Sequence, residues 1–158
     1  MARFAEDLIE RVGFACGVAY YETEYPGRPT GERLVLYIAL ATGLYPFVVD
    51  TGAPWSVLNP EIAESLGGNL ERDVCLGKGE RIRIQGAEFE GWLCKTRVTL
   101  RSECDGMDLD LSDVTVFVPT LDEGQPWPYP NFLGMRTFLN HIRYAVDPRE
   151  NAFYFGQP

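Results

Sequence analysis

Histidine is nearly absent from the sequence and cysteine is scarce, which limits the metal chemistry open to the chain. His141 is the only histidine among 158 residues. The four cysteines include no C-x-x-C pair; they are Cys16, Cys75, Cys94 and Cys104. Zinc sites usually combine such ligands at short, regular spacings. We therefore expect no metal and no other cofactor, and we expect reduced thiols that fill space in the core.

Long apolar runs and clusters of basic residues are also missing. No segment approaches the roughly 20 apolar residues that span a bilayer. The first eleven residues carry three acidic side chains and no signal-peptide pattern, so we expect a cytoplasmic protein with no membrane partner. Lys and Arg number 14 against 23 Asp and Glu, which gives a formal net charge of -9. Because this charge repels phosphate backbones, we expect no nucleic-acid partner.

The length and composition predict one mostly β domain. A chain of 158 residues corresponds to a single domain, and its 46% hydrophobic and 23% charged residues are near the globular average. Its 16 glycines and 11 prolines separate short runs of β-branched and aromatic residues. We assign residues 33–158 to the domain. Residues 1–32 are an N-terminal extension with no assigned structure, apart from a possible short amphipathic helix around Leu8.

Short apolar runs indicate the strands. They cover residues 33–41, 45–50, 81–84, 92–100, 114–118, 143–147 and 152–155. Pro46 cannot donate to a strand ladder, so it should lie at the start or edge of its strand. The proline-rich segment that runs from Leu121 to Pro130 is predicted to be a loop.

One helix is predicted over residues 60–66. Asn59 is a favoured N-cap, Pro60 suits the first helical position, and Gly67 follows where the helix should end. A second, helix-like stretch is predicted over residues 135–140.

The segment from Phe47 to Ala53, FVVDTGA, carries the candidate chemistry. Asp50 ends an apolar strand, which gives the carboxylate a rigid base of low dielectric constant. Thr51 can hydrogen-bond to neighbouring backbone, Gly52 permits a tight turn, and Ala53 leaves room beside the carboxylate. An ordinary strand-to-turn junction can contain the same tripeptide, so the flanking residues decide the interpretation.

With those flanking residues, the segment resembles the single-domain, retropepsin-like aspartic proteases. Their motif is two apolar residues followed by Asp-Thr/Ser-Gly-Ala/Ser. The resemblance includes Ser56, the helix that begins at Pro60, and a second signature, Phe132-Leu133-Gly134. It spans residues 33–156 in the expected order, whereas the N-terminal extension and the proline-rich loop have no counterpart.

The resemblance implies an acid-protease fold, a closed barrel with one or two short helices, and endopeptidase activity on peptide or protein substrates. In such enzymes two carboxylates share one proton; one activates a water and the other donates to the peptide carbonyl oxygen. Because the chain has a single such motif, a homodimer must pair Asp50 with its symmetry mate. The resemblance gives Asp50, Thr51 and Gly52 catalytic roles, gives Ala53 a role in substrate binding, and requires no metal.

The resemblance also implies a β-hairpin flap over the substrate, between about residues 75 and 91. Its tip lies either at Gly77-Lys78-Gly79 or near Gly86, and Gly86 is a candidate substrate-binding residue. Retroviral flaps are rich in consecutive glycines and isoleucine, and this segment departs visibly from that pattern.

Two other functions stay open. The chain is alternatively a non-catalytic retropepsin-like module for binding or scaffolding, either monomeric or loosely dimeric. A third interpretation is an unrelated β-rich binding protein. It predicts that Asp50 and Gly134 lie far apart, whereas the protease fold brings them together.

Four further residues have simple structural interpretations. Asp147 precedes Pro148 and is expected to form a turn, and His141 is expected at the surface or a helix end. Trp127 and Tyr129, in the proline-rich loop, either pack on the core or contact a substrate or partner.

Overall fold

The computed structural model describes residues 17–29, 31–72, 79–103 and 105–158. The amphipathic helix predicted around Leu8 lies outside these residues, as do Cys16, Cys75 and Cys104. Cys94 is described and is buried, as expected for a core thiol. No helix in the described part of the chain is long and apolar enough to cross a membrane.

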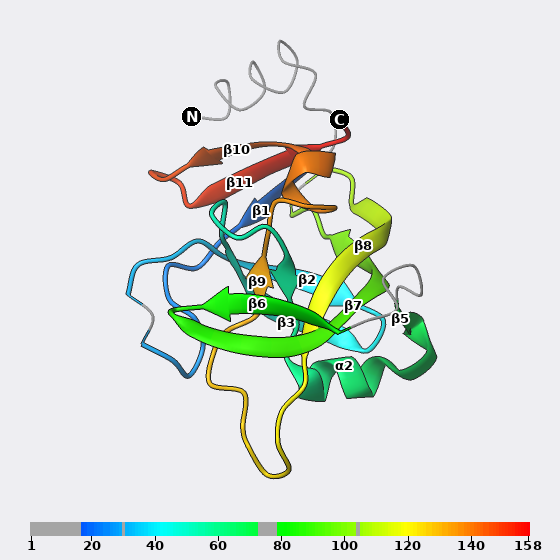
Figure 1. Cartoon of the computed structure of the whole chain (residues 1–158). Coiled ribbons are helices and arrows are strands. Elements are labelled where there is room, and N and C mark those ends of the chain that lie inside the picture. The colour runs from blue at the N-terminus through cyan, green and yellow to red at the C-terminus, as the bar shows by residue number, and fades with distance from the viewer. Residues whose placement is uncertain (1–16, 30, 73–78, 104) are drawn as a thin grey trace.

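The described chain is mostly β, as the sequence predicts (Figure 1). Its strands are β1 (Gly17–Tyr20), β2 (Val35–Leu40), β3 (Gly43–Val49), β4 (Ser56–Val57), β5 (Leu70–Arg72), β6 (Glu80–Ile84), β7 (Ala87–Leu100), β8 (Leu109–Pro119), β9 (Phe132–Leu133), β10 (Arg143–Asp147) and β11 (Ala152–Gly156). Its helices are α2 (Pro60–Leu66) and the 3-10 helices η1 (Gly67–Asn69) and η2 (Leu139–His141).

Six of these strands close into a barrel, which confirms the predicted architecture. The strand order is β2-β3-β9-β4-β8-β7, and β7 returns to β2 through the pair Ala39 and Thr99. Within this order β9 runs parallel to β3 and antiparallel to β4. The short strand β9 therefore lies in the middle of the sheet, between β3 and β4, which follow one another in the sequence.

A second, three-stranded sheet of order β1-β11-β10 packs against the barrel (Figure 1). Ala19 of β1 and Phe153 and Phe155 of β11 belong to the same buried cluster as Leu36 and Leu100 of the barrel. Part of the predicted N-terminal extension is therefore paired with the last strand of the chain. The predicted boundary at residue 33 stays a prediction.

The helix α2 has the predicted limits and the predicted caps. The Asn59 side-chain oxygen accepts a hydrogen bond from the Glu61 amide at 2.8 Å, Pro60 begins the helix, and Gly67 follows with a φ of +51°. Ala63 and Leu66 are buried, which fixes the helix to the barrel.

The second predicted helix is replaced by turns that end in η2. Thr137 has a φ of +62°, which an α-helix does not allow. Its hydroxyl accepts a hydrogen bond from the Thr115 amide at 2.7 Å, so a contact with β8 fixes this conformation. The sequence predicts a helix-like stretch here, and the structure has turns and a short 3-10 helix instead of an α-helix, with a contact to a distant strand at Thr137.

Pro46 lies inside β3, on a part of the strand that has a strand partner on one side. It is opposite Tyr37 of β2, while β9 pairs only with Val48 and Val49. The expected edge position of the proline is therefore confirmed.

Candidate active site

Asp50 lies directly beside the second signature. The strand β3 ends at Val49, and its last two residues pair in parallel with Phe132 and Leu133 of β9. The Asp50 amide then donates to the Leu133 carbonyl at 2.9 Å. The two signatures therefore meet, as the protease fold requires. This contact contradicts the interpretation as an unrelated β-rich protein, which places Asp50 and Gly134 far apart.

The loop after Asp50 folds back on its own carboxylate. The Gly52 amide donates to Asp50 Oδ1 at 2.9 Å, and the Ala53 amide donates to the Asp50 carbonyl oxygen at 3.2 Å. The first bond orients the carboxylate and the second closes the turn, while the side chain remains partly open to solvent. Thr51 and Gly52 are exposed. Their catalytic roles, and the contact of Thr51 across a dimer axis, stay predictions.

Gly134 packs directly against this loop. Its amide donates to the buried Ser56 Oγ at 3.0 Å, and the next amide, of Met135, donates to the Ala53 carbonyl at 2.8 Å. A Cβ atom at Gly134 would lie 2.5 Å from the Trp55 carbonyl oxygen and 2.9 Å from that of Ala53. Only glycine allows the two segments to approach so closely. The second signature therefore fixes the position of the Asp50 loop.

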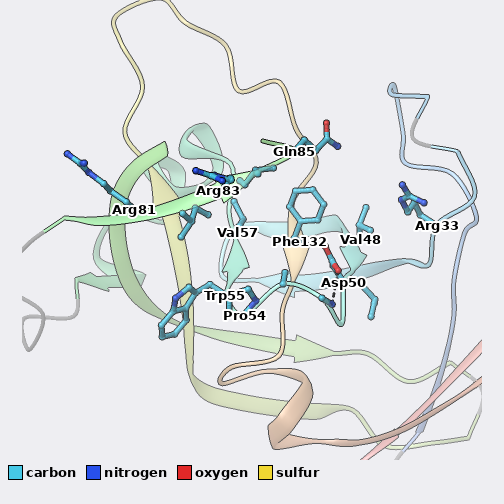
Figure 2. Close-up of a pocket in the computed structure, with 15 residues that line it drawn as sticks. Arg33, Val48, Asp50, Pro54, Trp55, Val57, Arg81, Arg83, Gln85 and Phe132 are labelled. Atoms are coloured by element: carbon cyan, nitrogen blue, oxygen red, sulfur yellow. Dashed lines mark hydrogen bonds between the residues drawn. The ribbon is translucent and has the colours of Figure 1, made fainter. Parts of the chain in front are cut away.

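A cleft of about 710 Å³ opens over Asp50 (Figure 2). Asp50 and Ala53 line it from the loop, and Val57 and Phe132 line it from β4 and β9. Strand β6 contributes the opposite wall through a run that includes Ile82. The cleft therefore places a partly exposed carboxylate beside apolar side chains and an extended strand, which is an arrangement suited to an extended peptide.

The wall opposite Asp50 is a hairpin formed by β6 and the first part of β7. Ile84 pairs with Ala87, so Gln85 and Gly86 form a two-residue turn, and their φ values are +48° and +85°. Such turns suit the twist of a hairpin and favour glycine. The tip of this hairpin therefore lies at Gln85 and Gly86.

This turn coincides with one of the two positions predicted for the flap tip, and the role of the hairpin as a flap stays a prediction. The other, at residues 77–79, begins outside the described residues, and Gly79 lies at the base of the hairpin. Gln85 is the tip residue that lines the cleft, and the sequence analysis did not select it. The available sequence signal for a turn at Gln85 was its position beside a glycine, between two apolar runs. A substrate contact by Gly86 stays a prediction, as does the role of Ala53.

The proline-rich loop supports the flap through an aromatic cluster. The Phe89 ring lies 5.2 Å from that of Trp127 and 5.6 Å from that of Tyr129, with edge-to-face geometry in both pairs. Trp127 is buried, whereas Tyr129 is half-buried and lines a second cavity of about 340 Å³. The packing predicted for Trp127 is therefore confirmed, and Tyr129 borders open space.

Asn131 hydrogen-bonds to three segments around the site, and no prediction from the sequence included it. Its Oδ1 accepts from the Asn59 amide at 2.7 Å, and its Nδ2 donates to the Pro46 carbonyl at 3.1 Å and to the Tyr25 hydroxyl at 3.2 Å. Asn131 is buried, and burial also raises the pKa of Tyr25. The only signal was a polar residue directly before the apolar second signature.

The remaining candidate residues have structural positions. The Asp147 side chain accepts from the Arg149 amide at 2.9 Å, which confirms its predicted role in a turn. His141 is exposed at the end of η2, as predicted. In the described ranges, no group of three or more His, Cys, Asp or Glu side chains is arranged to hold a metal ion.

The fold is similar to that of a solved structure described as a retropepsin-like aspartic protease from Rickettsia conorii. The TM-score is 0.51 at 16% sequence identity, and the match covers 89% of this chain and 90% of that one. At this identity the likeness shows the retropepsin-like fold. No protein-family model and no curated protein sequence matches the chain.

Proposed function

We propose that this protein is an aspartic endopeptidase. One observation carries the proposal: the Asp50 loop is held by the Gly134 signature and faces a cleft that a β-hairpin covers. The Gly52 amide orients the Asp50 carboxylate, and a general acid–base group requires a fixed orientation of this kind.

The catalytic unit is a homodimer, because a single chain supplies one Asp-Thr-Gly motif. A two-fold axis brings Asp50 opposite its symmetry mate, and two carboxylates about 3 Å apart then share one proton. The ionised carboxylate removes a proton from a bound water as the water attacks the peptide carbonyl carbon. The protonated carboxylate donates to the carbonyl oxygen, and no covalent intermediate forms. Thr51, which is exposed, binds the partner loop across the axis.

The substrate is an extended peptide that lies between the flap and the two carboxylates. Its main chain pairs with strand edges, and its alternate side chains enter pockets lined by residues such as Val57 and Phe132. We place this activity in the cytoplasm.

The test compares the wild-type protein with Asp50→Asn, which preserves shape and removes the charge. We expect sedimentation to show a dimer, and we expect an unstructured protein to be cleaved between about pH 4 and 7. In the variant the rate should fall at least about a hundredfold, since a general acid–base group is lost. Asp122→Asn, at an exposed loop position, is the matched control and should retain full activity.

The outcome of this test separates the enzyme from the non-catalytic module. A strict monomer that shows no Asp50-dependent cleavage at any pH, with or without a peptide ligand, overturns the proposal and favours the binding module.

A further inference from the structure

The loop between β1 and β2, residues 22–35, reaches across to the proline-rich loop. It is closed at its base, where the Glu22 and Val35 amides each donate to the carbonyl of the other residue at 2.9 Å. From this N-terminal loop, the Arg28 guanidinium donates to the Trp127 carbonyl at 2.8 Å. An arginine side chain therefore joins the N-terminal loop to the proline-rich loop.

A second contact ties the N-terminal loop to the strand that borders the cleft. The Tyr25 hydroxyl accepts from Asn131 Nδ2 at 3.2 Å and from the Asn131 amide at 3.3 Å. Burial raises the pKa of Tyr25, so this hydroxyl stays neutral. Because Asn131 directly precedes Phe132 of β9, the loop is fixed at the edge of the candidate site.

The second cavity, of about 340 Å³, lies between these two loops. Arg28 and Pro29 line it from the N-terminal loop. Pro128, Tyr129 and Pro130 line it from the proline-rich loop. The N-terminal extension has no counterpart in the resemblance, so the wall that it supplies is a feature of this chain.

This cavity adjoins the cleft over Asp50. The two spaces share four lining residues, which are Arg33, Val48, Gln85 and Phe132. Figure 2 shows these four residues at one end of the cleft and Trp55 at the other. Asp50 itself does not line the second cavity. An extended peptide that passes Asp50 and leaves by this end therefore enters the cavity with a side chain remote from the scissile bond.

The lining of the second cavity suits a flat, apolar ring. Five of its nine lining residues carry a ring, which are Pro29, Pro128, Tyr129, Pro130 and Phe132. Arg28 and Arg33 add two guanidinium groups, and the described lining includes no acidic residue. A guanidinium group stacks favourably on the face of an aromatic ring. Rings and guanidinium groups together therefore favour an aromatic ligand.

Tyr129 connects the cavity to the aromatic cluster beside the hairpin. Its ring lies 5.2 Å from that of Trp127 and 5.6 Å from that of Phe89, with edge-to-face geometry in both pairs. Trp127 is buried, whereas Tyr129 is half-buried and lines the cavity. A ring bound in the cavity therefore adds one more aromatic contact to an existing series.

We infer that the second cavity binds an aromatic side chain of the peptide, at a position remote from the scissile bond. This inference rests on the proposed function and names a feature of its substrates. The bound ring packs between Tyr129 and the guanidinium groups of Arg28 and Arg33. Because a two-fold dimer carries two such cavities, an aromatic residue is favoured on either side of the scissile bond.

The test measures binding separately from cleavage. The probes are unstructured fluorescent peptides with an apolar central pair and one test residue, which is moved stepwise away from that pair. The test residue is Phe in one set, Leu in the second and Ala in the third. At the favoured position, we expect Asp50→Asn to bind the Phe peptide about tenfold more tightly than the Ala peptide and about threefold more tightly than the Leu peptide.

Variants made in the Asp50→Asn background locate the preference. Arg33→Gln and Tyr129→Leu should each bring the affinity for the Phe peptide to within about twofold of that for the Leu peptide. Arg33 is exposed, so its variant decides the test even if Tyr129→Leu disturbs the aromatic cluster. Arg97→Gln makes the same change of charge at an exposed position on β7, where it borders a different cavity, and should leave the preference intact.

The outcomes distinguish this inference from the proposed function. If cleavage depends on Asp50 but Phe is preferred over Leu at no position, the aromatic pocket is wrong and the protease stands. If Phe peptides bind in an Arg33-dependent manner and no peptide is cleaved, the aromatic pocket stands and the protease is wrong.

Discussion

At the scale of single residues, two buried polar side chains hold the loop that carries Asp50. Ser56 accepts from the Gly134 amide, and Asn131 joins β3 to the cap of α2. Both lie where water does not replace a lost hydrogen bond, so each fixes the position of the backbone around it. The geometry of the candidate site thus depends on side chains that do not line the cleft.

Ser56→Ala tests this dependence. It leaves the buried Gly134 amide without its acceptor, so the free energy of unfolding should fall by about 1–3 kcal/mol in urea titrations. Ser112→Ala, at an exposed position of β8, is the control and should change stability by less than about 0.5 kcal/mol. Equal stability of the two variants would contradict a structural role for the Ser56 hydrogen bond.

The part of the candidate site whose residues lie close together in the chain could be predicted from the sequence. Asp50, Gly52 and Ser56 lie within seven residues of one another, and their spacing is legible in the sequence. Asn131 is different, because its partners Asn59, Pro46 and Tyr25 lie 72, 85 and 106 residues away. A polar residue before the apolar second signature does not indicate these distant partners, so the role of Asn131 follows only from the folded structure.

At the scale of elements, the flap depends on the proline-rich loop that faces it. Phe89, in the middle of the hairpin opposite Ile82, contacts Trp127 and Tyr129, and the three rings form one aromatic cluster. The prolines that exclude regular structure keep this loop in one irregular conformation. A segment without a counterpart in the resemblance therefore supports the element that covers the cleft.

Phe89→Leu should loosen the flap and leave the barrel intact. It preserves an apolar side chain but loses the edge-to-face contacts, worth about 0.5–1.5 kcal/mol for each aromatic pair. Amide hydrogen exchange in β6 should accelerate, and KM for a peptide substrate should rise more than kcat falls. The amides of β10 and β11 act as an internal control. Unchanged exchange in β6 would show that the aromatic cluster does not restrain the flap.

Elements with strong local signals were predicted well, and elements fixed by distant contacts were not. The limits of α2 followed from Asn59, Pro60 and Gly67 alone. Two glycine-containing segments were equally suitable in the sequence for the hairpin turn. Only the pairing register of β6 with β7 places that turn at Gln85 and Gly86. The turns before η2 depend on the bond between Thr137 and Thr115, which the sequence does not indicate.

At the scale of the whole molecule, the proposed dimer should be sensitive to pH. Two carboxylates held close together share a proton over part of the acid pH range in which separated carboxylates are both ionised. Association therefore takes up a proton and strengthens as the pH falls. The dimer dissociation constant should increase by as much as tenfold for each pH unit within the range where the dyad holds a proton that separated carboxylates have lost, and it should level off above that range.

Sedimentation equilibrium at several pH values provides the measurement. Asp50→Asn should dimerise with a dissociation constant that changes much less over the same pH range. A wild-type constant that is independent of pH would contradict a shared proton at the interface, even if the chain proves to be dimeric.

The strand β7 is 14 residues long and serves three parts of the molecule in turn. Its first residues pair with β6 in the flap, its middle pairs with β8, and Thr99 near its end seals the barrel against β2. Just beyond it, Glu103 bridges to Val18 of β1. A single strand, with a register shift between Thr96 and Val98, thus connects the hairpin over the cleft to the sheet that β1 forms with β10 and β11.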